Sequence, residues 1–148
     1  NFASASTAFA APVTDFVYAC PAYQSNISLS AFKPVSAYQF QDENAPEAFL
    51  PPASFPYAAA HASELQYLFT LPVRVPRPAL DGPQRHLSRD MQQYWTNFVK
   101  SGTPNGPGVP NWAQFNAVEG NFQALMPSQP QPTSNFGALH HCDFWATL

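Results

Sequence analysis

A single histidine, His61, lies in the stretch of this sequence that is best suited to chemistry. The small residues 58–60 precede it, after a proline-rich approach that ends at Tyr57. Small residues let the backbone come close to another surface, so the imidazole can project into a cleft. Imidazole titrates near neutral pH, which suits it to general acid–base catalysis. The simpler interpretation is a loop histidine that hydrogen-bonds to the backbone.

Two cysteines, Cys20 and Cys142, are the other reactive side chains and stand near opposite ends of the chain. From the residues alone, two buried thiols and one disulfide remain equally open. The sequence has no C-x-x-C pair and no Cys/His spacing typical of zinc. The run His140-His141-Cys142 does not predict a metal site, because adjacent residues on a helix or strand point in different directions.

A third candidate is a modification site. Asn26-Ile27-Ser28 has the form of an N-glycosylation sequon. The sequon has meaning only in a chain that a eukaryotic cell secretes, and so short a motif also arises by chance. Asn26 is therefore a possible glycosylation site whose use depends on the compartment.

The chemistry of His61 depends on the elements that lead to it. Residues 34–40 alternate enough to predict a strand, with most side chains buried as in a sheet covered on both faces. Residues 41–56 form a long polar, proline-rich loop between this strand and His61. Long loops tend to carry function, so this arrangement favours a functional site at the end of the loop.

A short helix is predicted directly after His61. Leu65, Leu68 and Phe69 recur at helical spacing and would anchor the segment to a core. Ser63 is one candidate cap for this turn. The alternative is a capping box from His61 to Glu64 that lacks its usual Ser or Thr.

Two longer helices frame the rest of the chain. The apolar stripe Val13, Phe16, Val17 and Cys20 predicts a helix that starts near Pro12 and that Pro21 stops or kinks. The clearest helix opens at 81–83 (Asp-Gly-Pro) and ends at 101–102 (Ser-Gly). Its apolar face, which we expect to pack on the body of the protein, consists of Leu87, Met91, Tyr94, Trp95 and Phe98. Residues 122–126 predict a short edge strand, and residues 129–133 a mobile or extended segment.

The composition limits the classes of function. The chain has 148 residues, enough for one domain with a core, and only 10% of them are charged. In an average soluble domain roughly 25% of the residues are charged. A surface this poor in charge usually packs against another part of a protein. The net charge of −3 and six scattered Lys and Arg residues argue against nucleic-acid binding. No window approaches the ~18 apolar residues that a membrane span needs.

Four segments, in chain order, resemble the type B carboxylesterase and cholinesterase family. They surround Cys20, surround His61, run from Trp95 to Trp112, and surround Cys142. The most specific is His-x-x-Glu-Leu-x-Tyr-x-Phe at residues 61–69, which resembles the segment that carries the family's catalytic histidine. Residues 111–115 (Asn-Trp-Ala-Gln-Phe) depart from the family's W-P-x-Y-like segment, and we interpret that region as scaffold.

The resemblance implies an α/β-hydrolase fold. Residues 1–148 would be the C-terminal part of a single domain, incomplete on its own, with late sheet strands, the catalytic-histidine loop and C-terminal helices. His61 would be the general base of a Ser-His-Glu/Asp triad, and Glu64 a supporting hydrogen-bonding residue. The resemblance also implies a Cys20–Cys142 disulfide, and hence a secreted, extracellular or periplasmic protein.

The rest of the catalytic machinery is not in the sequence. No two of the six glycines flank a serine as G-x-S-x-G, the nucleophile elbow of this fold, and the glycine run of the oxyanion hole is also missing. Asp15 is too close to Cys20 to be the triad acid. Glu64 would face along the helix rather than towards Nδ1 of His61. We therefore expect the serine, the acid and the oxyanion hole on an N-terminal portion that acts as partner, and this chain alone to be inactive.

Three hypotheses about function follow. The first is a part of a serine carboxylic-ester hydrolase that acts on a small-molecule ester through an acyl-enzyme, without a cofactor or metal. The alternative is a non-catalytic, cholinesterase-like binding or adhesion protein, which a residue other than serine at the elbow would favour. The third is an independent small secreted binding domain, which would fold alone as a monomer.

Overall fold

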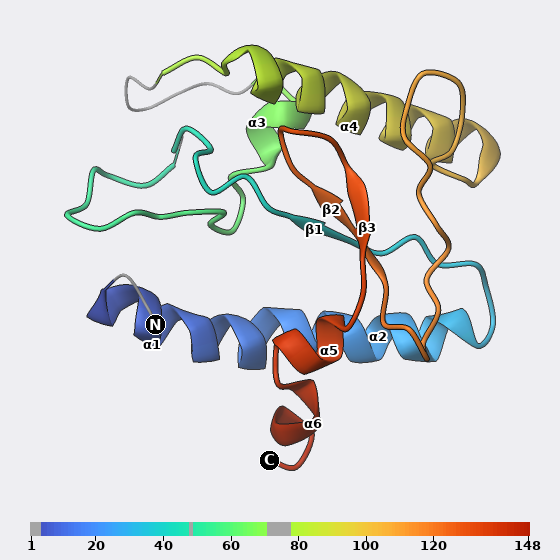
Figure 1. Cartoon of the computed structure of the whole chain (residues 1–148), viewed down its shortest axis with the longest axis horizontal. Helices are drawn as coiled ribbons and strands as arrows, with labels where there is room; N and C mark the ends of the chain where they lie inside the picture. The colour runs from blue at the N-terminus through green and yellow to red at the C-terminus, as the bar shows by residue number, and fades with distance from the viewer. Residues whose placement is uncertain (1–3, 48, 71–77) are drawn as a thin grey trace. The chain divides into compact units, whose positions relative to one another are not determined.

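The computed structural model describes residues 4–47, 49–70 and 78–148. It is a mixed α/β structure with the elements in the order α1, η1, α2, β1, α3, α4, β2, β3, α5 and α6 (Figure 1). The chain divides into two compact units. Unit 1 is drawn from the described residues of 1–37, 113–122 and 132–148, and unit 2 from those of 38–112 and 123–131.

Unit 1 begins with one continuous run of helix in three parts. They are α1 (Ala5–Thr14), the π-helical turn η1 (Asp15–Ala19) and α2 (Cys20–Ser30). Pro21 does not stop the helix, because α2 continues past it to Ser30; the alternative, a kink at Pro21, stays a prediction. In η1 the N–H of Cys20 bonds to the carbonyl of Asp15. This wider hydrogen-bonding pattern makes room in the ladder for a proline, which has no N–H to contribute.

The apolar stripe predicted for this helix is mostly exposed in unit 1. Val13, Phe16 and Val17 are 40%, 53% and 48% exposed, whereas Cys20 is buried. A π-helical turn holds more than 3.6 residues, so the spacing that links Val13 to Cys20 does not place them on one face. The core of unit 1 consists instead of Ala19, Ala37, Phe115, Phe122 and Phe136, with Tyr23, Ile27 and Val35 packed against it.

Two short helices, α5 (Phe136–Leu139) and α6 (Cys142–Trp145), complete unit 1. Both pack against α2 (Figure 1). The rings of Phe122 and Phe136 stack with their centroids 3.8 Å apart. Gly137 lies so close to Tyr23 that a Cβ atom there would be 2.6 Å from its ring, so only glycine fits at this position.

The sheet has the strand order β1-β2-β3. The strands are β1 (Tyr38–Phe40), β2 (Phe122–Leu125) and β3 (Gln131–Thr133). In unit 2, β1 runs parallel to β2, with Tyr38 opposite Gln123 and Phe40 opposite Leu125. The predicted strand 34–40 is thus confirmed only over its last three residues. The prediction of an edge strand at 122–126 is wrong in its position, because β2 lies between two strands and every residue of it is buried. The segment predicted to be mobile or extended contains β3.

Helix α4 (Gly82–Ser101) has the bounds that the sequence predicts. Asp81 caps its N-terminus by accepting the N–H of Gln84, and Gly102 ends it with a positive φ of 76°. Three residues of the predicted apolar face are fully buried, but Phe98 is 51% exposed. The core of unit 2 consists of Tyr67, Leu87, Met91, Tyr94, Trp112 and Leu125.

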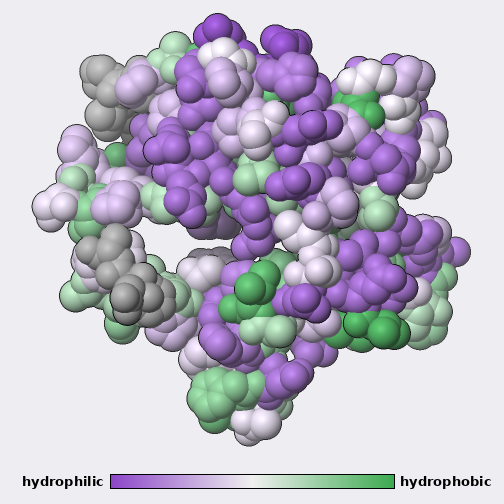
Figure 2. Space-filling model, in the orientation of Figure 1, coloured by the Kyte–Doolittle hydropathy of each residue, from purple (hydrophilic) through white to green (hydrophobic). Residues whose placement is uncertain are grey.

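Hydrophobic side chains also reach the surface of both units. Figure 2 shows them among hydrophilic residues on the face in view. The most exposed are Phe9, Phe32, Val99, Val118 and Leu148. In the described part of the chain, no helix has both the length and the apolar character that a membrane crossing requires.

Candidate active site

His61 occupies an exposed turn of unit 2 that is built from small residues. The backbone has positive φ angles at Ala58 (53°) and Ala62 (71°), on either side of the histidine. Alanine rarely adopts this left-handed conformation, and each case costs about 1–2 kcal/mol. The turn is closed by the N–H of Ser63, which bonds to the carbonyl of Ala60 at 3.0 Å. Strain of this kind concentrates at functional sites.

Ser63 is neither a helix cap nor a candidate nucleophile. Its hydroxyl donates to the carbonyl of Ala60 at 2.7 Å, and the residue is 1% exposed. The N-cap of α3 (Leu65–Leu68) is Glu64, whose side chain makes no capping bond. Both predicted caps are therefore wrong. The hydroxyl of Ser63 stabilises the turn that carries His61 rather than the helix that follows.

Helix α3 is anchored by different residues from those predicted. Leu65 and Leu68 are only half-buried and Phe69 is 59% exposed, whereas Tyr67 is fully buried. The carbonyl of Tyr67 also accepts hydrogen bonds from α4, the helix on which α3 packs. The donors are Oγ of Ser88 at 2.6 Å and Nε2 of Gln92 at 3.1 Å. The apolar spacing correctly predicted a helix, but the hydrogen bonds of Tyr67 determine which face of α3 is buried.

Glu64 is half-buried, three residues after His61. Burial raises the pKa of the Tyr38 phenol on β1, and the charge of Glu64 raises it further. The carboxylate therefore acts electrostatically on Tyr38 in β1. Its supporting role for His61 stays a prediction.

Among the described residues of unit 2, two other groups have shifted pKa values, and both lie on α4. Burial raises the pKa of Asp90, while the charges of His86 and Arg89 partly lower it. Burial, together with the charge of Asp90, raises the pKa of Tyr94 to about 12, and the nearby amide of Gln123 lowers it in part. Asp90 lies in the core, with Nε2 of His86 3.6 Å from its Oδ2.

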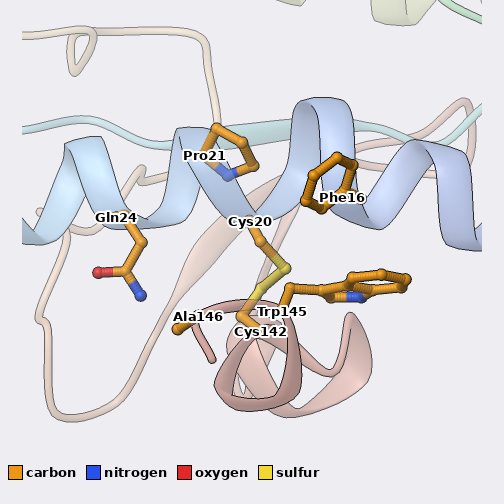
Figure 3. A pocket seen from close by; sticks show the side chains of 7 residues that line it. All are labelled: Phe16, Cys20, Pro21, Gln24, Cys142, Trp145 and Ala146. Carbon is orange, nitrogen blue, oxygen red and sulfur yellow. A yellow bond between two sulfur atoms is a disulfide. The ribbon is translucent and has the colours of Figure 1, made fainter. Parts of the chain in front are cut away.

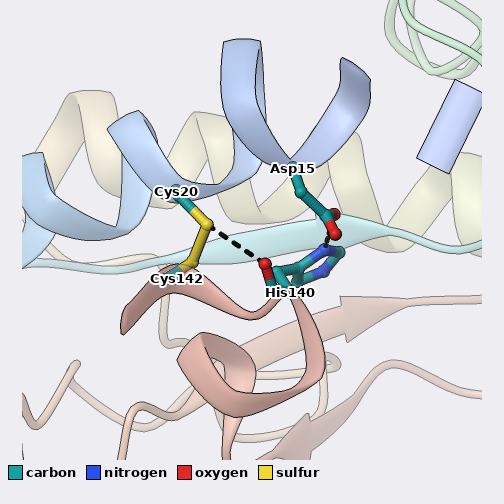
Figure 4. Close-up of a disulfide and its surroundings, with 4 residues drawn as sticks. All are labelled: Asp15, Cys20, His140 and Cys142. Carbon is teal, nitrogen blue, oxygen red and sulfur yellow. Dashed lines mark hydrogen bonds and ion pairs between the residues drawn. A yellow bond between two sulfur atoms is a disulfide. The ribbon is translucent and has the colours of Figure 1, made fainter. Parts of the chain in front are cut away.

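Cys20 and Cys142 form a disulfide in unit 1, as the resemblance implied (Figure 4). The bond joins the start of α2 to the start of α6, and both residues are buried, at 5% and 1% exposure. The sulfur of Cys20 also lies 3.3 Å from the carbonyl oxygen of His140. A disulfide sulfur has no proton to donate, so this approach is a packing contact.

A histidine–carboxylate pair lies beside the disulfide. Nδ1 of His140 is 2.6 Å from Oδ1 of Asp15, and the two side chains are 17% and 13% exposed (Figure 4). The ring of His140 also packs on Phe136, with centroids 4.3 Å apart. Sequence reasoning missed this pair. The expected disulfide could have indicated it. Asp15 shortly precedes Cys20 and His140 shortly precedes Cys142, so a bond between the two cysteines also brings Asp15 and His140 together.

A small apolar cavity of about 170 Å³ also lies in unit 1. The rings of Phe16 and Trp145, 5.5 Å apart, and the disulfide form part of its wall (Figure 3). Its remaining lining residues are Pro21, Gln24 and Ala146. None of these side chains can transfer a proton or attack a carbonyl, so the cavity is not a candidate catalytic site.

The glycosylation site and the metal site are the remaining candidates that the sequence raises. Asn26 lies in α2, is half-buried, and its glycosylation stays a prediction. Across the residues that the structure describes, no three His, Cys, Asp or Glu side chains gather as a metal site would require. His61 and Glu64 share one turn of unit 2, and the two cysteines share unit 1.

Comparison with known proteins identifies a consistent set of relatives. Residues 1–145 match the sequence profile described as "Carboxylesterase family". Cocaine esterase from Homo sapiens is 30% identical over 134 residues, which are 90% of this chain and 23% of that protein. Acetylcholinesterase-1 from Trittame loki is 31% identical over the same shares of the two chains. The chain therefore spans about a quarter of the length of these relatives.

A third relative matches over a shorter stretch. It is described as "Fatty acyl-CoA hydrolase precursor, medium chain", from Anas platyrhynchos. The identity is 34% over 89 residues, which are 60% of this chain and 15% of that protein.

Proposed function

Because this chain belongs to the carboxylesterase family, we propose that it is the histidine-bearing part of a serine carboxylic-ester hydrolase. The observation that carries the proposal is the placement of His61. The residue is exposed on a turn with two strained alanines, while the helix directly after it is anchored in the core. An exposed imidazole on a fixed base is what a general acid–base catalyst needs.

His61 has two proton transfers to perform in this reaction. As the serine oxygen attacks the ester carbonyl, the imidazole takes the serine proton and then delivers it to the departing alcohol. In the second half, the imidazole takes a proton from water as the water oxygen attacks the acyl-enzyme. It then returns that proton to the serine oxygen, which restores the starting state and releases the carboxylic acid.

The serine, the triad acid and the oxyanion hole are assigned to an N-terminal portion of the protein outside this sequence. Two facts support this assignment. The sequence holds no G-x-S-x-G segment, and the chain corresponds to about a quarter of each relative described above. This chain alone would then have no turnover. The family and its relatives indicate an ester as substrate.

The disulfide supports a route through an oxidising compartment, since such bonds are rare in the cytosol. A relative described as a precursor is consistent with this route. We therefore assign the protein to the secreted, extracellular or periplasmic space.

Covalent trapping tests the proposal. The complete protein, meaning this chain together with the polypeptide that supplies the serine, is treated with an alkyl fluorophosphonate, which phosphonylates activated serines. Peptide mass spectrometry should find one phosphonylated serine in a G-x-S-x-G segment, and His61→Ala should slow its formation by about 10²-fold or more. The matched control is His86→Ala, which removes an exposed histidine of the same unit and should label at the parent rate. Absence of any labelled serine would favour the non-catalytic binding protein.

A further inference from the structure

A buried carboxylate is hydrogen-bonded to the segment that carries His61. Asp42 follows β1 and is 2% exposed. Its Oδ2 accepts hydrogen bonds from the phenol of Tyr67 and from Nε2 of Gln84 at 2.9 Å. Its Oδ1 accepts the N–H of Asn44 at 2.9 Å. The carboxylate thus joins the loop after β1, helix α3 and the first turn of α4.

This carboxylate is well matched to its partners. All three groups that face it are donors, which compensates the cost of burying a carboxylate in an apolar core. Gln84 is itself held in place, because it completes the capping box with Asp81 and also donates to the carbonyl of Asn44 at 3.1 Å. The position of Asp42 is therefore defined by the rigid end of a long helix.

The hydrogen bonds from Tyr67 continue back to His61. The N–H of Tyr67 bonds to the carbonyl of Glu64 at 3.0 Å, and that of Leu65 to the carbonyl of Ala62 at 3.2 Å. Ser63 closes the same turn through Ala60, as described above. Residues 60–67 are thus one hydrogen-bonded segment, with His61 at one end and the buried phenol of Tyr67 at the other.

A second anchor acts on the same segment. Nε2 of Gln66 donates to the carbonyl of Ser63 at 3.0 Å and to the carbonyl of Pro46. Gln66 is 7% exposed. The loop of residues 42–46 therefore holds the histidine-bearing segment at two adjacent residues, one through Asp42 and one through its backbone.

We infer that Asp42 is a positioning residue for His61 in the hydrolase reaction, acting through the phenol of Tyr67. The inference rests on the proposed function. Strained backbone at Ala58 and Ala62 would relax if the segment were released at its buried end. The hydrogen bond between Asp42 and Tyr67 holds the imidazole in the orientation that the reaction needs. A misplacement of about 1 Å in such a group can lower the rate by about 10²-fold.

The test compares two tyrosines in the complete protein. Tyr67→Phe removes the phenol that reaches Asp42. Tyr94→Phe is the matched control, because Tyr94 is equally buried in the same core and donates one hydrogen bond, to the carbonyl of Pro110 at 2.8 Å. Both variants should have a lower melting temperature, and Tyr67→Phe the lower of the two, because its bond is to a carboxylate and that of Tyr94 is to a neutral carbonyl. Only Tyr67→Phe should lower kcat for a p-nitrophenyl ester, by about 10-fold, with KM within about two-fold of the parent.

A double-mutant cycle asks whether Asp42 and Tyr67 act through one contact. Asp42→Asn should lower kcat at least as much as Tyr67→Phe, and the double variant should be no worse than Asp42→Asn alone. Multiplicative losses would show two separate effects and overturn the inference. If Tyr67→Phe does not fold, Ser88→Ala removes the hydrogen bond that its hydroxyl donates to the carbonyl of Tyr67, and it should also lower kcat.

Modification of His61 by diethyl pyrocarbonate, followed by peptide mass spectrometry, gives a readout that does not need turnover. Tyr67→Phe should change the modification rate of His61 by about three-fold or more, and Tyr94→Phe should leave it unchanged. A parent without turnover would contradict the proposed function. A parent with turnover, but with equal kcat and equal His61 modification in both tyrosine variants, would contradict the positioning role alone.

Discussion

Nδ1 of His140 lies 2.6 Å from Oδ1 of Asp15, so unit 1 holds a histidine oriented by a carboxylate. This is the geometry that orients a catalytic imidazole, yet the pair packs against a disulfide and an aromatic ring. His61, in contrast, is exposed. We therefore propose a structural role for the Asp15–His140 pair, and the catalytic role stays a proposal for His61.

Removal of the Asp15–His140 contact should reduce stability and leave catalysis intact. His140→Ala should lower the free energy of unfolding by about 1–3 kcal/mol, because it leaves the largely buried Asp15 without this partner. Urea denaturation of the complete protein measures the loss. The value of kcat should stay within about two-fold of the parent. A loss of turnover comparable to that of a triad residue would reverse the two assignments.

The disulfide should contribute more to stability than any single hydrogen bond. Its cysteines are 122 residues apart, and closure of so long a loop is worth about 4–5 kcal/mol in the chain-entropy description. Cys20→Ser and the double variant with Cys142→Ser should therefore be destabilised by similar, large amounts. Non-reducing intact mass confirms which samples hold the bond. Denaturation curves that coincide with those of the oxidised parent would contradict this prediction.

Asp90 should make stability fall as pH rises through the acidic range. Burial raises the pKa of its carboxyl in the folded protein, so the folded state binds the Asp90 proton more tightly than the unfolded state does. The resulting stabilisation is complete below the unfolded pKa of about 3.9 and is lost as pH rises through the higher, folded value. Relative to the parent, Asp90→Asn should gain stability as pH rises above the unfolded pKa of about 3.9.

His86→Ala provides the control for Asp90. The charge of His86 lowers the pKa of Asp90, so its removal should raise that pKa further and extend the fall in stability to higher pH. Melting temperatures measured across the pH series report both effects. Parallel profiles for the parent and Asp90→Asn would show that this carboxyl titrates alike in the folded and unfolded states.

Ala62 should be one of few positions where glycine is no worse than alanine. Its φ of 71° favours glycine, so Ala62→Gly should change the free energy of unfolding by about +1 kcal/mol or leave it unchanged. Ala62→Val should destabilise the protein and lower kcat, since a β-branched residue is strained further in this conformation. Ala59→Gly is the control, because Ala59 does not have a positive φ. A stabilising Ala59→Gly would remove backbone strain as the explanation.

Local sequence signals predicted some elements well. The bounds of α4 follow from Asp81 and Gly102, whose capping preferences are properties of the neighbouring backbone. The resemblance, rather than any pattern of spacing, indicated the disulfide and the role of His61. The resemblance depends on the residues around each cysteine and around His61, and the spacing of apolar residues carries no such information.

The missed features are one local departure from α-helical geometry and several contacts between residues far apart in the sequence. The π-helical turn η1 changes which side of the first helix is buried, and no 3.6-residue pattern reports that change. Tyr67 is buried in place of the neighbouring leucines because Asp42, 25 residues earlier, accepts its phenol. Asp15 and His140 are 125 residues apart. Contacts of this kind become visible only when the tertiary structure brings the partners together.

The turnover of a p-nitrophenyl ester by His61→Ala in the complete protein tests the central claim most directly, with His86→Ala as the matched surface control. The account predicts that kcat/KM falls by about 10³-fold or more for His61→Ala and stays within about two-fold for the control, with both variants folded. A folded His61→Ala protein that hydrolyses the ester at a rate near that of the parent would contradict the assignment of His61 as the general base.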